Sequence, residues 1–277
     1  MSISLDIIQN HNDKKKYKYN NIHFLTSTAK KDFLVVGFHG MASHSVYPVF
    51  RGYDYSFKNA NILSISDPLH GYYKDLTIGW YLNTKKYSNT VRNILEIVEH
   101  IKKITGATNI IFISNCSGGI IASRLACMTN QYALIANPHT IVRSNETWIH
   151  YHWNDQSIEY GYRMPLLQND NFKKIPVMSG ILKKNNDELL DINDLDIRSY
   201  IKSYGFPKQI RAYTHINDYT AEWLHKLSDF YKTHNNSTLN VVFNKNKVKS
   251  PHHSPFNNTN LKTEIQKFIN DIHNHKL

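Results

Sequence analysis

The segment from Ile110 to Ala122 constrains the fold more than any other part of the chain. It starts with a short apolar run rich in β-branched residues, becomes polar at Ser114-Asn115-Cys116-Ser117, and continues after two glycines with helical spacing. A strand, a sharp turn and a helix in this order are typical of a nucleophile elbow, which exposes one reactive side chain at the turn. Ser114 and Gly118 are small enough to let the strand and the helix approach closely. We therefore predict that Cys116 is the covalent nucleophile of an acyl transfer or hydrolysis reaction.

The same turn allows two other interpretations. Ser117 would be the nucleophile if Asn115 and Gly119 were its flanking positions, and an isolated Cys before a helix is often structural. The second cysteine, Cys127, falls within the helical pattern and would lie about 16 Å from Cys116 along one helix, which is beyond the reach of a disulfide. Two unpaired thiols fit a reducing compartment, so we expect a cytoplasmic protein.

Strand-like and helix-like segments alternate along most of the chain. Apolar runs predict strands at 3–8, 22–26, 33–38, 61–66, 109–113, 132–136, 209–213 and 239–243. Apolar residues at helical spacing predict helices at 85–103, directly after the elbow, at 219–232 and at 260–273. This alternation predicts an α/β fold, with a mostly parallel central sheet flanked by helices on both faces. Active sites of such sheets lie beyond the carboxyl ends of the strands.

Residues 139–206 interrupt this alternation. Their first half is aromatic and polar, and their second half is acidic and helical. A segment of this length without the regular pattern is typical of an insertion or lid. We therefore predict a core formed by residues 1–138 and 207–277, with the lid inserted between them.

A thiol nucleophile needs a base, and the base needs an acid that orients it. Asp218 follows the predicted strand 209–213, and His252-His253 follow the predicted strand 239–243. The carboxyl ends of parallel strands meet at one edge of the sheet, so we predict a triad of Cys116, His253 and Asp218 there. His252 is the alternative base, because it is the direct neighbour of His253, and Asp218 has a simpler interpretation as a helix N-cap.

Two backbone N–H groups are needed to hold the oxyanion that forms during acyl transfer. Ser117 supplies one, because it directly follows the nucleophile. The second is expected from the loop after strand 33–38, where Gly40 allows a tight turn and Met41 is the predicted donor. A helix N-terminus and an imidazolium both lower the pKa of a thiol, so Cys116 is expected to rest as a thiolate.

The charge balance favours an anionic partner. The chain has 33 Lys and Arg against 22 Asp and Glu, a net charge of +11, which suits an acidic polysaccharide, a phosphorylated co-substrate or a membrane surface. No nucleic-acid-binding motif is present in the sequence, so nucleic acid is not expected.

The histidines lack the spacing of a metal site, so no metal is expected. No apolar run approaches the ~18 residues of a membrane span, and the first residues lack the pattern of a secretory signal.

Four short motifs occur in a fixed order: Phe38-His39-Gly40, Ser114-Asn115-Cys116-Ser117-Gly118-Gly119, Asn217-Asp218, and His253-Ser254-Pro255. With them the chain resembles the α/β-hydrolase superfamily from Phe33 to Leu125 and again from Ile210 to the end. The elbow is similar to that of polyhydroxyalkanoate synthases, which use a Cys nucleophile. Ser114 stands where Gly is commoner in this superfamily.

More loosely, the chain resembles capsular-polysaccharide biosynthesis proteins of the XcbB/CpsF type. The residues that carry this resemblance are the His39-Gly40 segment, Asp67-Pro68, Trp80-Tyr81 and the elbow. It implies that His39, Trp80 and Tyr81 bind substrate, and that the protein associates peripherally with a capsule-synthesis complex.

These observations together predict an acyltransferase. It would transfer an acetyl group from acetyl-CoA to a hydroxyl of an acidic bacterial polysaccharide, with the lid excluding water. An esterase or thioesterase of the same fold and a catalytically silent scaffold in capsule synthesis are the two alternatives. The sequence leaves the oligomeric state open.

Overall fold

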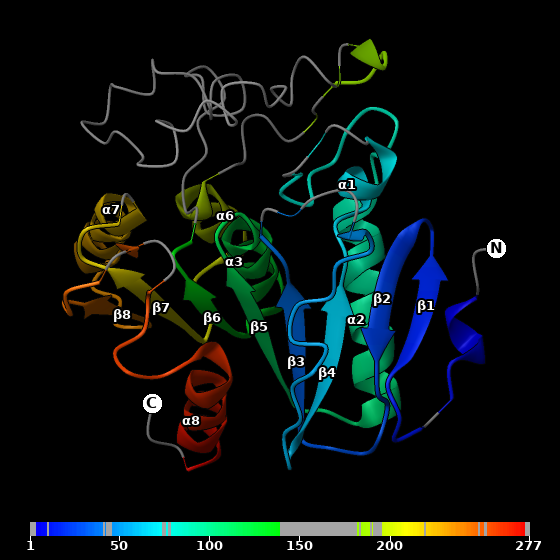
Figure 1. The fold of residues 1–277 in the computed structure, drawn as a ribbon, viewed down its shortest axis with the longest axis horizontal. Coiled ribbons are helices and arrows are strands. Elements are labelled where there is room, and N and C mark those ends of the chain that lie inside the picture. The colour runs from blue at the N-terminus through cyan, green and yellow to red at the C-terminus, as the bar shows by residue number, and fades with distance from the viewer. Residues whose placement is uncertain are drawn as a thin grey trace.

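In the residues that the structure describes, eight strands form one sheet in the order β1-β2-β4-β3-β5-β6-β7-β8 (Figure 1). The computed structural model describes residues 4–9, 11–40, 42, 46–73, 76, 79–138, 182, 184–188, 190, 196–218, 220–248, 250–251 and 254–274. The strands are β1 (Lys15–Tyr19), β2 (Ile22–Thr26), β3 (Phe33–Phe38), β4 (Ala60–Ile65), β5 (Asn109–Asn115), β6 (Tyr132–Ala136), β7 (Gln209–His215) and β8 (Leu239–Asn244). β1, β2 and β4 pair antiparallel, and β4, β3, β5, β6, β7 and β8 pair parallel. The predicted α/β fold with a mostly parallel sheet is confirmed.

The central strands are apolar because both of their faces are covered. Every residue of β3 is buried, and β5 is buried from Ile110 to Ser114. Continuous Val, Ile, Leu and Phe runs are the expected composition of strands that helices cover on both sides. The register pairs Gly37 of β3 with Ile113, and Phe38 with Ser114, so these two strands end side by side.

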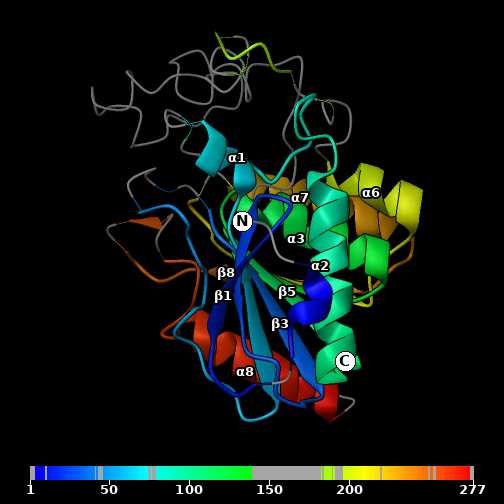
Figure 2. The same ribbon diagram turned by 90° about the vertical axis from the view of Figure 1, so that its right-hand side faces the viewer.

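The helices are distributed unequally between the two faces (Figures 1 and 2). α2 (Thr90–Thr105), α3 (Gly118–Thr129), α6 (Ile197–Tyr204) and α7 (Thr220–Thr233) pack with one set of strand side chains. α8 (Leu261–His273) packs with the other set. The loop between β3 and β4 also covers this second face, since a Cβ on Gly37 would lie only 2.5 Å from the Arg51 carbonyl oxygen.

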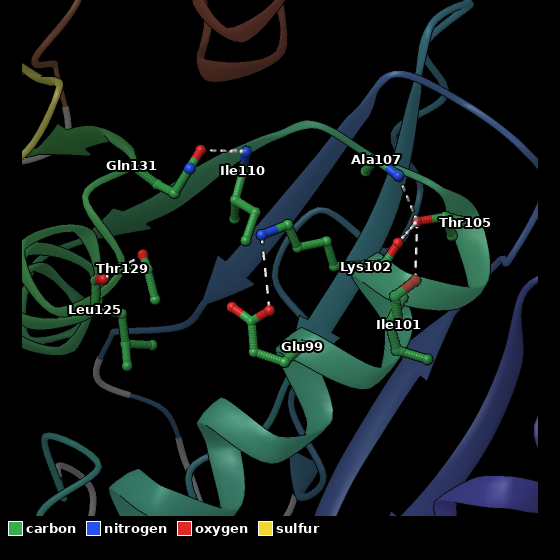
Figure 3. A network of polar contacts seen from close by, with 9 residues as sticks. All are labelled: Glu99, Ile101, Lys102, Thr105, Ala107, Ile110, Leu125, Thr129 and Gln131. Atoms are coloured by element: carbon green, nitrogen blue, oxygen red, sulfur yellow. Dashed lines mark hydrogen bonds and ion pairs between the residues drawn. The ribbon is translucent and has the colours of Figure 1, made fainter.

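The amino ends of the central strands are held by short polar contacts (Figure 3). Gln131 accepts a hydrogen bond from the Ile110 N–H through its Oε1 atom, at 3.0 Å. Thr105 at the end of α2 donates to the Ile101 carbonyl at 2.8 Å, and Gly106 follows in the left-handed conformation that ends many helices. These contacts lie at the end of the sheet opposite to the predicted active site.

The first residues of the chain differ from the prediction. Residues 3–8 were expected to form a strand, but Leu5–Ile7 is a short 3₁₀ helix whose preceding Ser4 accepts a hydrogen bond from the Asp6 N–H. The first strand is instead Lys15–Tyr19. Its charged residues are suited to a sheet edge, where lysines discourage pairing with another chain.

The predicted division into core and lid is described only in part. Residues 139–181 lie outside the described residues, whereas α6 is described and packs its buried Ile197, Tyr200 and Ile201 into the same apolar cluster as α3 and α7. The boundaries of the lid therefore stay a prediction. None of the helices in the described part of the chain has both the length and the apolarity needed to cross a lipid bilayer.

Candidate active site

Cys116 lies at the turn between β5 and α3, as the elbow motif predicts. Its φ angle is 51°, in the left-handed region that non-glycine residues seldom adopt. Two hydrogen bonds hold this conformation: the Cys116 N–H donates to the Ala136 carbonyl at 3.0 Å, and the Gly119 N–H donates to the Cys116 carbonyl at 3.0 Å. Backbone strain that neighbouring strands maintain is common at reactive positions.

The elbow leaves no room for a side chain at position 118. A Cβ on Gly118 would lie 2.8 Å from the His39 carbonyl oxygen and 3.1 Å from the Phe38 carbonyl oxygen. The first turn of α3 therefore packs directly on the end of β3. This contact explains the requirement for a small residue two positions after the nucleophile.

Ser117 differs from Cys116 in conformation and exposure. Its φ angle is −60°, it is only 2 % exposed, and it directly precedes α3. The N–H groups at the start of a helix have no partner within the helix, which suits Ser117 to the predicted role of oxyanion donor. Cys116 is partly exposed, so the geometry favours Cys116 over Ser117 as the nucleophile.

The loop after β3 passes directly beside the elbow. A Cβ on Gly40 would lie 3.0 Å from the Cys116 Cβ and 3.1 Å from the Asn115 carbonyl oxygen. Gly40 is therefore adjacent to the nucleophile, in the loop from which the second oxyanion donor was expected. Met41 itself lies outside the described residues, so its role stays a prediction.

The loop after β7 contains the predicted acid. Asp218 is 3 % exposed, and its Oδ1 accepts hydrogen bonds from the Thr220 N–H at 2.8 Å and the Thr220 hydroxyl at 2.5 Å. Asp218 thus does act at the start of α7, as the N-cap interpretation predicts. A carboxylate has a second oxygen, and Oδ2 is the atom that a triad would use.

His215 links this loop to the loop after β8. Its Nδ1 accepts a hydrogen bond from the Asn217 N–H at 3.0 Å, so its Nε2 carries the proton and donates to the Asn246 carbonyl at 2.8 Å. Both ring nitrogens are therefore occupied in positioning backbone. The predicted bases, His252 and His253, lie outside the described residues, and their roles stay predictions.

A buried network that the sequence pattern does not predict lies between the ends of β3 and β4. Asp67 is 2 % exposed and accepts hydrogen bonds from the Leu69 N–H at Oδ1 and the Tyr81 N–H at Oδ2, both at 3.0 Å. The Tyr81 hydroxyl donates to the Ile65 carbonyl at 3.1 Å and accepts from the His39 N–H at 2.9 Å. Trp80 and Tyr81 both have positive φ angles, and Asp67 helps to hold this strained turn.

Burial controls the charge states in this network. It lowers the pKa of His39 from 6.5 to about 4 and raises the pKa of Asp67 from 3.8 to about 6. His39 is therefore neutral near pH 7.

His39, Trp80 and Tyr81 are all buried side chains, so direct contact between them and a substrate stays a prediction. The signal for Asp67 in the sequence was its position two residues beyond a buried strand.

Comparisons with known proteins give structural matches but no match to a family model or a curated sequence. Among solved structures, the capsule O-acetyltransferase of Neisseria meningitidis serogroup A is 16 % identical, with a TM-score of 0.57 over 95 % of this chain and 96 % of that chain. A variant of that enzyme in complex with CoA gives a TM-score of 0.56 at 13 % identity, over 96 % of this chain and 98 % of that chain.

An esterase of Pyrococcus furiosus is 13 % identical, with a TM-score of 0.53 over 95 % of this chain and 88 % of that chain. The chain has the α/β-hydrolase fold. This confirms the predicted fold, and membership of the superfamily stays a prediction. The resemblance to XcbB/CpsF-type proteins is not tested by these structures and stays a prediction.

Proposed function

We propose that the protein is an acyltransferase in which Cys116 carries the acyl group. The observation that carries this proposal is the conformation of Cys116: a partly exposed thiol at a strained strand–helix turn, directly before a helix N-terminus. A structural cysteine would not require a positive φ angle supported by hydrogen bonds with β6 and α3.

The proposed mechanism gives each step to one of the predicted residues. The Cys116 thiolate attacks the carbonyl carbon of an acyl thioester, and the N–H groups of Ser117 and Met41 stabilise the oxyanion. Collapse of this intermediate breaks the bond to the thiol leaving group, which takes a proton from His253. An acceptor hydroxyl then gives its proton to His253 and attacks the acyl carbon, and Cys116 leaves as thiolate. Asp218 keeps the imidazole oriented throughout.

Two observations support a polysaccharide hydroxyl as the acceptor and acetyl-CoA as the donor. The net charge of +11 attracts both a polyanionic chain and the phosphates of CoA. The chain also matches almost the full length of an enzyme described as a capsule O-acetyltransferase, and one structure of that enzyme holds CoA. Association with a capsule-synthesis complex belongs to the same proposal.

Mass spectrometry of the intact protein after incubation with acetyl-CoA tests the proposal. The expected result is one acetyl adduct on Cys116 in the unaltered protein and none in Cys116→Ala. Cys127→Ala is the matched control, since Cys127 is a buried thiol whose pKa burial raises to about 12, and it should be acetylated like the unaltered protein. Failure of acetyl-CoA and of activated aryl esters to acylate Cys116 would contradict the proposal and favour a scaffold.

An esterase is the second candidate, because the Pyrococcus furiosus esterase has the same fold. The acyl-enzyme is common to both activities, and only the second step differs. Product analysis with and without an acidic oligosaccharide separates them. A transferase forms the sugar ester at the expense of free acetate, whereas an esterase releases acetate at the same rate in both reactions.

A further inference from the structure

A polar pocket that none of the proposed catalytic steps uses lies at the same edge of the sheet as Cys116. Its volume is about 140 Å³, and it lies between the β1–β2 turn, α1 (Pro68–Tyr72) and the first turn of α2 (Figure 1). We call it the α2 pocket. The polar and aromatic side chains that the argument uses are Asn20, Tyr72, Lys86, Tyr87, Asn89 and Asn93.

The sheet fixes where this pocket lies relative to the nucleophile. The Ser66 N–H donates to the His23 carbonyl at 2.9 Å, so the start of β2 lies beside the carboxyl end of β4. β4, β3 and β5 are parallel, so their carboxyl ends, including the end that leads to Cys116, share this edge. Three strand spacings of about 4.8 Å each, about 14 Å in total, separate β2 from β5.

Three asparagines reach the pocket from two elements. Asn20 and Asn21 have φ angles of 44° and 67°, the conformation of a two-residue hairpin turn, which Asn adopts readily. Asn20 Nδ2 donates to Asn93 Oδ1 at 3.2 Å, which links the turn to α2. Asn89 is the residue before α2, but its side chain makes no capping bond with the helix, although capping is the usual role of Asn there. The side chains of Asn89 and Asn93 therefore present amide groups to the pocket.

Two stacked tyrosines form another part of the pocket. The rings of Tyr72 and Tyr87 lie 3.6 Å apart between centroids, with an angle of 9° between their planes. Burial raises the pKa of both hydroxyl groups, to about 12 for Tyr72, so both keep their protons at neutral pH. A tyrosine offers an apolar ring and a polar tip, which match the C–H groups and the hydroxyl groups of a sugar.

Lys86 is the one charged side chain among the described residues that line the pocket. Its backbone N–H donates to Asp187 Oδ1 at 2.9 Å, and its Nζ donates to the Asn185 carbonyl at 2.5 Å. These bonds hold the residue in place. An ammonium group has three donors, so two remain for an acidic group of a ligand.

We propose that the α2 pocket is an acceptor subsite that binds one sugar unit of an acidic polysaccharide. Amide side chains both donate and accept hydrogen bonds, as sugar hydroxyl groups do, and Lys86 supplies a charge-assisted bond to the acidic group. A volume of about 140 Å³ is smaller than the roughly 300 Å³ of a site that encloses a whole ligand, so the pocket holds one unit of a longer chain. The proposal rests on the proposed function, because it states how the acceptor of that reaction is held.

Isothermal titration calorimetry on the Cys116→Ala variant tests the subsite without any transfer reaction. The ligands are short oligomers of sialic acid, of galacturonic acid and of hyaluronan. We expect at least one of them to bind. Adding Asn93→Leu or Lys86→Met should weaken that binding about 3- to 10-fold, the effect of losing one hydrogen-bonded contact. Absence of binding by all three, or unchanged affinity in both pocket variants, would overturn the inference.

Each pocket variant has a matched control. Lys103→Met removes the same charge near the other end of α2, about 20 Å from Thr90. Asn270→Leu removes a helical amide that accepts a bond from Gln266 at 3.0 Å, as Asn93 accepts from Asn20. Both controls should bind the oligomer like the parent protein. Equal weakening by Lys103→Met and Lys86→Met would show that net charge alone attracts the ligand, and would overturn the assignment of Lys86.

Steady-state acetyl transfer in protein with Cys116 intact shows whether the bound chain is the acceptor. For the oligomer that binds, Asn93→Leu should raise KM about 3- to 10-fold and leave kcat unchanged. KM for the corresponding monosaccharide should not change, because one unit does not reach both the pocket and Cys116. An equal rise in KM for both acceptors would overturn the inference of a separate subsite.

The two proposals fail in distinguishable ways. Acetylation of Cys116 without binding that depends on the pocket would overturn the subsite and leave the proposed function intact. Binding that depends on Asn93 and Lys86, without any acylation of Cys116, would overturn the proposed function and leave the pocket as a sugar-binding site.

Discussion

The neutral, buried state of His39 makes a quantitative prediction for the pH dependence of stability. Burial lowers the pKa of His39 from 6.5 to about 4, so between these pH values the unfolded chain binds a proton at this position and the native protein does not. The free energy of unfolding then falls as the pH falls. Each pH unit in this window costs the native state about 1.4 kcal/mol.

His39→Asn removes this titration and keeps a polar side chain. Between about pH 7.5 and about pH 5, the free energy of unfolding of the unaltered protein should therefore fall by about 2 kcal/mol more than that of the His39→Asn variant. Urea unfolding followed by circular dichroism at the two pH values measures this difference.

Asp67 does not disturb the comparison, although it titrates in the same range. Burial raises its pKa to about 6, so its native form binds a proton before its unfolded form does, and this group stabilises the protein as the pH falls. The effect is present in both proteins and cancels in their difference. Stability curves that run parallel from pH 7.5 to 5 would show that His39 is not held neutral by its surroundings, and would refute the reasoning.

Three further predictions concern the elbow and the triad. Gly118→Ala should lower the free energy of unfolding by about 1–3 kcal/mol, because the added methyl group overlaps two carbonyl oxygens of β3 and the residue after it, and urea unfolding checks this. Asp218→Asn should keep the cap on Thr220 and full stability but lose on the order of 10²- to 10⁴-fold in acyl transfer; full activity in this variant would show that Asp218 is only a cap. His253→Gln should lower acyl transfer on the order of 10²- to 10⁴-fold while His252→Gln does not, and the reverse result in a steady-state assay would make His252 the base.

The elbow could be predicted from sequence because all of its determinants are local. A buried strand ends at Asn115, a helix begins at Gly118, and the two residues between them must turn the chain. β3 and β6 were also predicted with the bounds that they have, because an uninterrupted apolar run is a strong signal for a strand buried on both faces.

β1 was missed because its signal is not local. Its alternating Lys and Tyr residues carry little apolar surface, and the strand exists through its pairing with β2, where Tyr17 lies opposite Phe24 and Lys15 opposite Thr26. A residue pattern that is half polar reads as a turn until the partner strand is known. The apolar contact that defines it is the stacking of Tyr17 on Phe24.

The network around Asp67 was missed for a related reason. His39, Asp67 and Tyr81 are far apart in the chain, and only the parallel pairing of β3 with β4, with Phe38 opposite Ile65, brings the first two together. The sequence shows a polar residue after each strand but not which of them are buried. Burial is what changes the pKa values of His39 and Asp67, so their charge states could not be predicted before the fold was known.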